Sequence, residues 1–327
     1  MQSLLDRKLI VITGKGGVGK TTIAASLGLL AARAGRRTIV AELGQESRLP
    51  ALFGVPAAAA GVECALSERL SSITIDPDRA LLEWLQVLGG RVSGRVLASS
   101  GTFQYFAAAA PGAKELVTMV KLWQLTRGAA QRGRRGGGGT GGQDLVVLDA
   151  PATGHALGLL GSPHTFGAIA RVGPIAGQTR QLRELLESPS QSAYLAVALP
   201  TEMAVTEALE LEQGLRDQLG CGLAAVVVNA LLPQRFTAAE LARIESLQRS
   251  PEPALVASDT ADTQAPAAMR SAVVAARAVH QRARFQHSQV ARLRRRGFDV
   301  ASVPFLWTGT LGPADLARIA GVLDRRL

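Results

Sequence analysis

The chain has 327 residues and is 47% apolar, so it can bury a sizeable core, which excludes disordered, collagen-like and coiled-coil builds. Its two cysteines, Cys64 and Cys221, are too few for a disulfide framework, a four-cysteine zinc knot or a self-contained iron–sulfur site. The formal net charge is +10; five of the 36 basic residues are lysine and 31 are arginine, with clusters at 127–135 and 270–296.

Short apolar runs alternate with helical patterns along the chain, which predicts an α/β fold: a doubly wound, mostly parallel sheet flanked by helices. The first run, Leu-Ile-Val-Ile-Thr, shows no polar alternation and predicts a strand buried on both faces. Strands are predicted at residues 9–13, 38–42, 73–75, 144–149, 194–199, 223–229 and 299–303. Helices are predicted at residues 22–34, 77–88, 114–126, 174–187, 203–219, 237–247, 266–296 and 313–326.

The order of these elements predicts one doubly wound domain over residues 1–327, without internal duplication. A helical region is inserted in it at residues 77–135, and its first helix begins with Asp76 as N-cap and Pro77 in the first turn. Residues 136–142, Gly-Gly-Gly-Gly-Thr-Gly-Gly, carry too few side chains to pack and predict a flexible loop.

The loop between the first strand and the first helix carries the strongest functional signal. It reads Gly-Lys-Gly-Gly-Val-Gly-Lys-Thr, a full match to the phosphate-binding pattern G-x-x-x-x-G-K-[ST] between a strand and a helix. Glycines let backbone N–H groups surround phosphates, and the helix N-terminus favours anions. We therefore predict ATP and Mg²⁺ as cofactors, with a catalytic Lys20 on the β and γ phosphates and Thr21 on the metal. The predicted nucleotide-binding residues of this loop are Gly14, Lys15, Gly16, Gly17, Val18, Gly19, Lys20, Thr21 and Thr22.

Lys15, directly after the first glycine, is the unusual residue of the loop. The stretch resembles the deviant Walker A motif K-G-G-x-G-K-[ST]-T, which is shared by ParA, MinD, nitrogenase iron protein and the ArsA-type ATPases. In that subgroup the lysine at this position crosses a dimer interface and contacts the partner's nucleotide. The resemblance implies a catalytic Lys15 that acts as an arginine finger does, and a nucleotide state coupled to dimer geometry. A solvated lysine is the alternative.

An acidic residue ends the fourth predicted strand. Asp149 stands where a Walker B aspartate holds Mg²⁺, so we predict it as a catalytic and metal-binding residue. The next residues, Ala-Pro-Ala-Thr-Gly-His-Ala-Leu, resemble the second switch of the ArsA family, D-T-A-P-T-G-H-T-L, with the proline displaced by one place to Pro151. The resemblance puts Thr153, Gly154 and His155 in this switch and couples loss of the γ phosphate to movement of the next helix. A structural role is the alternative for the histidine.

Shorter stretches resemble other parts of the ArsA family. Residues 111–115 are similar to a P-G-x-x-E segment that opens a client-region helix, and residues 199–207 are similar to a P-E-x-x-x-x-E stretch. Asn229 ends a buried strand, and in this family such an asparagine hydrogen-bonds the adenine ring. Pro304 and Phe305 fall where a second loop beside the base would lie.

The first switch departs from the family pattern, which reads like S-T-D-P-A-H. Counting back from Leu49 puts Gly44 at the position of the aspartate that orients the attacking water. Glu42 lies two residues earlier, about 6.5–7 Å away in an extended chain, and is the predicted catalytic acid. Glu46 could approach only if the loop rearranges. Because displacing a water-orienting group by 1 Å can cost about 100-fold, we predict nucleotide binding with slow hydrolysis.

The chain lacks the residues that several classes of function require. Without a Cys-x-x-Cys pair, neither zinc nor the zinc-bridged homodimer of tail-anchored-protein targeting factors is expected. The cysteines match neither the triad of arsenite-stimulated pump ATPases nor the cluster ligands of nitrogenase iron protein. No charge-free apolar run reaches the ~18 residues of a membrane span, and the start does not resemble a signal peptide. With the low cysteine usage, these features predict a cytoplasmic protein.

Three functional hypotheses remain. The first is an ArsA-like ATPase, a dimeric ATP/ADP switch that handles a hydrophobic client or membrane-protein partner through the region at residues 77–135. The second is a hydrolysis-poor nucleotide-binding subunit that forms a heterodimer with a related ATPase, motivated by Gly44. The third is a ParA/MinD-like positioning switch that binds DNA or membrane through the arginine clusters. Solvated faces are the favoured interpretation of those clusters, and nucleic acid is not expected as a partner. The apolar side chains that form either a client face or core are Leu116, Val117, Met119, Val120, Leu122 and Trp123.

Overall fold

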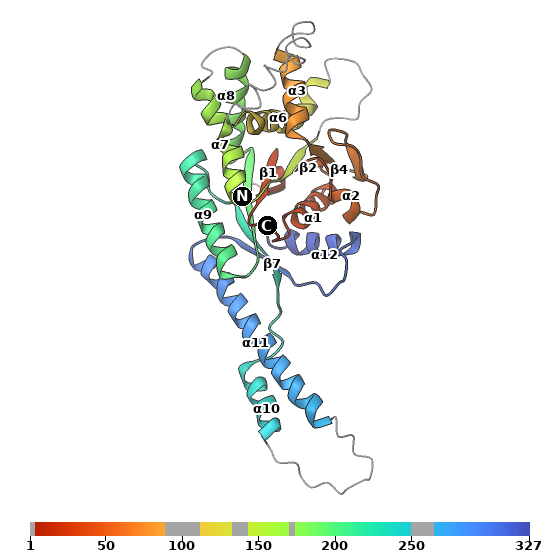
Figure 1. The fold of residues 1–327 in the computed structure, drawn as a ribbon, viewed down its shortest axis with the longest axis vertical. Coiled ribbons are helices and arrows are strands. Elements are labelled where there is room, and N and C mark those ends of the chain that lie inside the picture. Colours follow the sequence, from red (N-terminus) through yellow and green to blue (C-terminus); the bar gives the residue numbers. More distant parts are fainter. Residues whose placement is uncertain (1–3, 89–111, 133–142, 170–173, 250–264) are drawn as a thin grey trace.

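The computed structural model describes residues 4–88, 112–132, 143–169, 174–249 and 265–327. Within them, eight strands form one sheet in the order β3-β4-β2-β5-β1-β6-β7-β8 (Figure 1). Every neighbouring pair is parallel except β3 and β4, which confirms the predicted α/β fold class. The strands are β1 (Leu9–Thr13), β2 (Thr38–Leu43), β3 (Cys64–Ser67), β4 (Leu70–Ile75), β5 (Leu145–Asp149), β6 (Ser192–Ala198), β7 (Ala225–Leu231) and β8 (Val300–Pro304).

Helices cover both faces of the sheet, and each face has its own apolar cluster. One face packs against α1 (Lys20–Arg33), α2 (Leu49–Leu52) and α12 (Pro313–Asp324). The other packs against α3 (Pro77–Leu88), α6 (Ala113–Arg132), α7 (Thr153–Ile169), α8 (Pro174–Glu187), α9 (Glu202–Leu219) and the C-terminal part of α11 (Ala265–Arg295). The remaining described helices are η1 (Leu4–Asp6) and α10 (Ala238–Arg249).

β1 lies between β5 and β6, so the loop that follows it opens near the centre of the sheet. All five residues of β1 are buried, as its unbroken apolar run predicts. The register pairs Asp149 with Ile12 on one side and with Glu42 on the other. Because parallel strands end at the same edge, this register brings the phosphate loop and both acids together at the carboxyl edge.

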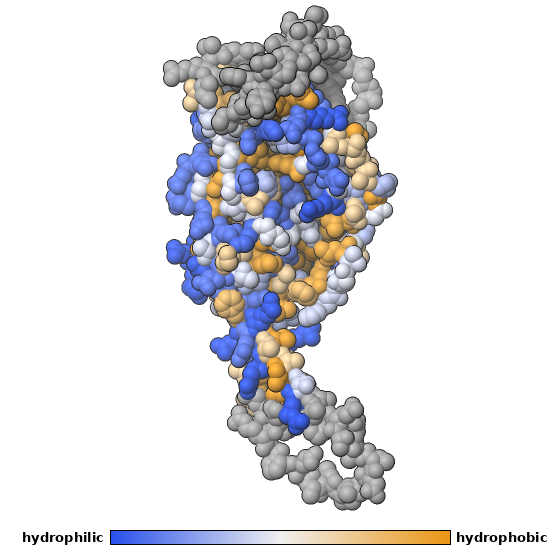
Figure 2. Space-filling view, in the orientation of Figure 1, coloured by the Kyte–Doolittle hydropathy of each residue, from blue (hydrophilic) through white to orange (hydrophobic). Residues whose placement is uncertain are grey.

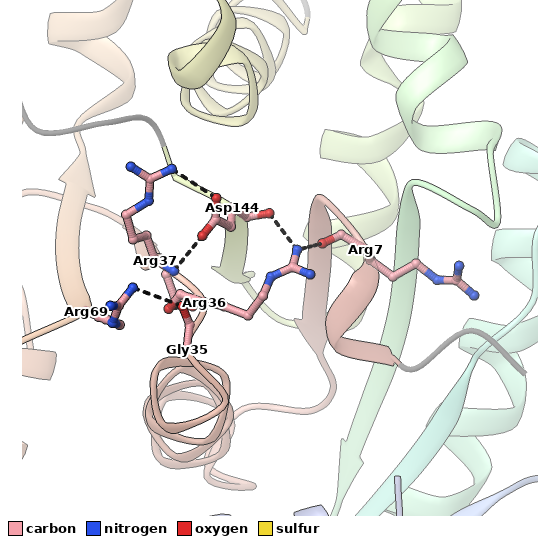
Figure 3. Close-up of polar contacts among 7 residues, drawn as sticks. Arg7, Gly35, Arg36, Arg37, Arg69 and Asp144 are labelled. Carbon is pink, nitrogen blue, oxygen red and sulfur yellow. Dashed lines mark hydrogen bonds and ion pairs between the residues drawn. The ribbon is translucent and has the colours of Figure 1, made fainter.

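Arginines tie the starts of three strands together at the opposite edge of the sheet (Figure 3). The Asp144 carboxylate accepts hydrogen bonds from the backbone N–H (2.9 Å) and the guanidinium (3.1 Å) of Arg37. The Arg36 guanidinium donates to the carbonyl oxygens of Asp144 (2.9 Å) and Arg7 (3.4 Å). Burial opposes the shift, but the contacts with Arg37 and the nearby Arg36 hold the pKa of Asp144 below its ordinary value. Part of the arginine excess is therefore structural.

The predicted helical insertion is described through α3 and α6, which pack on each other. Asp76 accepts a hydrogen bond from the Asp78 N–H (2.9 Å), which confirms it as the cap of α3. α6 packs on α7 and α8, and five of the six side chains considered as a client face are fully covered. The core interpretation of these side chains is therefore the one found: Leu116, Val117, Met119, Val120 and Leu122 are buried, and Trp123 is partly buried. The rest of the insertion and the predicted glycine loop lie outside the described residues.

α10 and α11 follow β7 and precede β8, and they project from the body at the end of the long axis opposite α3, α6 and α8 (Figure 1). α11 is 31 residues long. Its His280 and His287 rings lie 3.0 Å from the carbonyl oxygens of Phe236 and Leu232, which ties the helix to the segment leaving β7. None of the described helices combines the length and apolarity that crossing a bilayer requires.

Candidate functional site

The phosphate loop leaves β1 and turns into α1 at Lys20. Gly14 has a φ of +148°, and a Cβ atom there would lie 2.1 Å from the carbonyl oxygen of Val197 on β6. Only glycine fits this position. Gly17 and Gly19 also have positive φ values, +80° and +91°. The loop is therefore held in a curled backbone conformation, as its motif predicts.

Lys20 and Thr21, in the first turn of α1, lie beside the end of β5. The Thr21 hydroxyl donates a hydrogen bond of 2.5 Å to Oδ2 of Asp149. The Lys20 ammonium donates to the carbonyl oxygen of Lys15 (3.1 Å), so it is bonded to the loop itself. Burial lowers the pKa of Lys20, and the charge of Asp149 opposes that shift. Three residues predicted from separate motifs thus converge at one point.

Asp149 is largely buried, and its second oxygen, Oδ1, has no hydrogen-bond partner. Burial raises the pKa of Asp149 to about 6; the Thr21 hydrogen bond opposes this, and the charge of Glu42 adds to it. A buried carboxylate oxygen without a partner is costly unless water or a cation meets it. Hydroxyl and carboxylate oxygens are ligands that Mg²⁺ prefers, so this donor set fits the ion.

Glu42, on β2, lies beside Asp149 of β5. Its carboxylate is buried and is hydrogen-bonded to the loop that follows β2. It accepts hydrogen bonds from the Ser47 hydroxyl and from the backbone N–H groups of Arg48 (3.1 Å) and Leu49 (3.4 Å). The structure thus brings Glu42 to the site, but both of its carboxylate oxygens accept hydrogen bonds from the loop that follows β2.

Gly44 leaves β2 with a φ of +145°, a backbone conformation that residues with side chains rarely adopt. A Cβ atom there would meet open space, so strain rather than a clash opposes a larger residue. The Gly44 N–H donates to the carbonyl oxygen of Ile75 (3.0 Å), which attaches this loop to the end of β4. Glu46, the other acid of the loop, is exposed.

The segment that resembles the family's second switch leads into α7, whose first residue is Thr153. The Thr153 hydroxyl is buried without a hydrogen-bond partner, whereas Gly154 and His155 are exposed. Thr13, at the end of β1, donates to the carbonyl oxygen of Pro151 (2.8 Å). The chain between β5 and α7 is therefore tied to the strand that carries the phosphate loop.

Lys15 forms an ion pair with Glu207 of α9, with 2.7 Å between Nζ and Oε1. The two side chains are 36% and 30% exposed. Met203, also on α9, is 66% exposed, and its sulfur lies 4.0 Å from the Lys15 nitrogen. The lysine expected to reach a second chain is therefore paired within its own.

Asn229 connects β7 to the phosphate loop. Its side-chain N–H donates to the carbonyl oxygen of Val18 (2.9 Å), and its oxygen accepts from the N–H of Ala230 (2.9 Å). Ala230 has a φ of +57°, the one positive value among the non-glycine residues that the structure describes. The predicted adenine-contacting side chain is thus at the loop, where it is bonded to backbone.

Pro304 ends β8 and Phe305 follows it, next to the strand that carries Asn229. Pro304 pairs with Leu231 of β7, and the Phe305 N–H donates to the Leu231 carbonyl oxygen (2.9 Å). The ring of Phe305 meets that of Trp307 edge-on, with centroids 4.8 Å apart, and the Arg235 guanidinium lies 5.5 Å from the Trp307 ring centre. An exposed aromatic pair therefore stands at the end of β8.

The sequence profile of the anion-transporting ATPase family, ArsA, matches residues 7–172, just over half of the chain. The chain belongs to this family. The matched part of this ArsA-family ATPase contains the phosphate loop, the loop after β2, Asp149 and the start of α7.

Named relatives agree with the family match. ATPase BagA of Mycobacterium tuberculosis is 30% identical over 243 residues, which cover 72% of this chain and 68% of BagA. ATPase get3 of Botryotinia fuckeliana is 26% identical over 226 residues, or 67% of this chain and 60% of that protein. ATPase ARSA1 of Chlamydomonas reinhardtii is 25% identical over 294 residues, or 70% and 36%.

Sequence reasoning missed three contacts of this ArsA-family site. Glu207 lies in the stretch that resembles P-E-x-x-x-x-E, but its pairing with Lys15 crosses 192 positions of the chain. The hydrogen bond from Ser47 to Glu42 lies within one loop, and a serine five residues after a buried acid was its only signal. Trp307 carried no signal beyond being aromatic near Phe305.

Proposed function

We propose that this ATPase is a dimeric switch that binds ATP with Mg²⁺ and couples the state of the nucleotide to handling of a hydrophobic client or partner protein. The observation that carries the proposal is the convergence of Lys20, Thr21 and Asp149 at the phosphate loop, with one Asp149 oxygen left without a partner. Bound magnesium would supply positive charge that balances the phosphates. Thr21 and Asp149 would hold it, the loop amides would bind the phosphates, and Asn229, Pro304 and Phe305 would border the base.

Lys15 is the residue that would link nucleotide binding to the formation of the dimer. Its ion pair with Glu207 is partly exposed, so breaking it costs about 1 kcal/mol or less. The exposed Met203 beside it offers apolar surface that a second subunit can cover. In this proposal Lys15 leaves Glu207 when two chains close on nucleotide and reaches the partner's phosphates.

Hydrolysis is proposed to be slow. Glu42 has both carboxylate oxygens engaged, and position 44 carries no side chain to orient a water molecule. We expect turnover below about 1 s⁻¹, the low end of ordinary enzymes. The same observation supports a second candidate, a nucleotide-binding subunit of a heterodimer in which the related ATPase provides the missing acid.

The surface that would contact a client is proposed to lie in the region at residues 77–135. Because the apolar face of α6 is core, a hydrophobic client would have to use other residues of the 77–135 region, such as Leu82 of α3, which is 40% exposed.

The proposal is tested by light scattering coupled to size-exclusion chromatography with no nucleotide, ADP or ATP, each with Mg²⁺. We expect a dimer with ATP for the native chain, a monomer with retained ATP binding for Lys15→Ala, and an unchanged dimer for the control Lys8→Ala. Glu207→Gln releases Lys15 and should dimerise at lower ATP concentration. A monomer in every state of the purified chain that becomes a dimer only with a co-purified ATPase favours the heterodimer. Absence of ATP binding would end both accounts.

A further inference from the structure

α11 carries an unusual density of positive charge. Its 31 residues include arginines at 270, 277, 282, 284, 292, 294 and 295, and no aspartate or glutamate. The helix projects from the body, so much of its surface faces solvent (Figure 1). None of these arginines takes part in the contacts described above for the phosphate loop.

Three of these arginines lie on one face. Arg270, Arg277 and Arg284 are spaced by seven residues, which is close to two helical turns, and all three are exposed. Two apolar side chains share this face and are also exposed, Val274 at 66% and Phe285 at 48%. We call these five residues the α11 stripe. The opposite face is the buried one, with Ala283, Gln286 and Val290.

The residues of the α11 stripe are unfavourable together if they face only water. Within the described part of the chain, neither Arg270 nor Arg284 forms an ion pair, and like charges along one face repel each other. Val274 and Phe285 forgo apolar burial beside them. The visible face of the projection mixes strongly hydrophilic and hydrophobic residues (Figure 2). A partner that suits both is anionic and admits apolar side chains.

We propose that the α11 stripe docks on an anionic lipid surface. Arginines next to a negatively charged leaflet gain electrostatic attraction, and their long stems let the guanidinium groups stay at the headgroups. Phe285 and Val274 then enter the boundary between headgroups and acyl chains, as the apolar side of an interfacial helix does.

Two other partners fit the same residues less well. Nucleic acid would satisfy the arginines but would leave Val274 without an apolar environment. A second copy of this chain pairing through the same stripe would bring arginine against arginine. The lipid surface is the partner that uses both the charge and the apolar side chains.

The test is co-sedimentation of the full chain with vesicles of phosphatidylcholine alone or mixed with phosphatidylglycerol. We expect binding only to the anionic vesicles. The variant R270Q/R277Q/R284Q should lose about 100-fold in affinity, at about fivefold per arginine. The matched control R318Q/R325Q/R326Q removes the same charge from exposed positions on and after α12 and should bind as the native chain does.

A second variant separates lipid from other polyanions. V274S/F285S should weaken vesicle binding at high salt, where the arginine attraction is screened, and should leave duplex DNA retention unchanged. ATP binding and circular dichroism establish that each variant is folded. Equal loss in the control triple variant, vesicle binding indifferent to both α11 variants, or tighter retention on duplex DNA than on anionic vesicles would each overturn the proposal.

Discussion

Burial of the Asp149 carboxylate has a cost in the nucleotide-free protein. Its pKa is raised from 3.8 to about 6, so the folded chain holds this proton at a pH where the unfolded chain has lost it. Stability from this group is therefore full below pH 3.8 and is lost as pH rises through about 6. At about 1.4 kcal/mol per pH unit, the ionised carboxylate costs up to about 3 kcal/mol at neutral pH.

We predict that Asp149→Asn stabilises the nucleotide-free protein and removes magnesium-dependent ATP binding. The amide carries no charge to bury, and its oxygen can still accept from Thr21. Thermal unfolding should show a gain of about 1–3 kcal/mol above pH 6 that shrinks toward pH 4. A variant less stable than the native chain at neutral pH would show that Asp149 already has a compensating partner.

The backbone at Gly44 leads to a second prediction. Gly44→Asp restores the acid of the family's first switch in sequence, but with φ at +145° it should cost about 1–3 kcal/mol of stability. We expect no rise in ATP turnover, because the strained loop does not present the carboxylate as the family pattern does. Gly44→Ala is the matched control for strain alone. Turnover rising tenfold or more in the aspartate variant, and not in the alanine variant, would contradict this.

Local motifs explain why most of the site was predictable at this scale. The phosphate loop and Asp149 follow strand ends within a few residues, and parallel strands bring such ends together. The ion pair of Lys15 with Glu207 was not predictable, because it depends on where α9 lies relative to the loop.

At the scale of elements, α6 is a core helix in the described structure. We predict that Leu116→Ala destabilises the chain by about 2–5 kcal/mol, because Leu116 is fully buried and its removal leaves a cavity. Leu82→Ala, at an exposed position of α3, should change stability by less than about 0.5 kcal/mol. Chemical denaturation measures both. Similar small effects of the two variants would mean that α6 detaches readily and returns to the client-face interpretation.

The elements that were missed have identifiable physical causes. The sequence pattern does not predict the bounds of α7, because its glycines and Pro163 lower helix propensity, yet packing on the sheet overrides them. Pro163 cannot donate to the Leu159 carbonyl oxygen, and the Ser162 hydroxyl donates to it instead (2.7 Å). β4 begins at Leu70, three residues before the predicted start, because the serines there are buried without being apolar.

At the scale of the whole molecule, the fold class could be predicted from the sequence, but the order of the strands in the sheet could not. Alternating strands and helices indicate a parallel sheet, but the order depends on which distant segments pair. The roles of the arginines could not be predicted either. Arg36 and Arg37 join the starts of strands, whereas Arg270, Arg277 and Arg284 of α11 are exposed. Composition alone does not separate these two groups.

The central position of β1 has a consequence for synthesis. Leu9 pairs with Val146 on one side and Ser192 on the other, so β1 has both of its neighbours far downstream in the chain. A nascent chain must close loops of well over a hundred residues before this strand is enclosed, which favours slow, late completion. Val197, whose carbonyl confines Gly14, is made later than Asp149. The packing of the phosphate loop against β6 is therefore completed only after residue 197 has been synthesised.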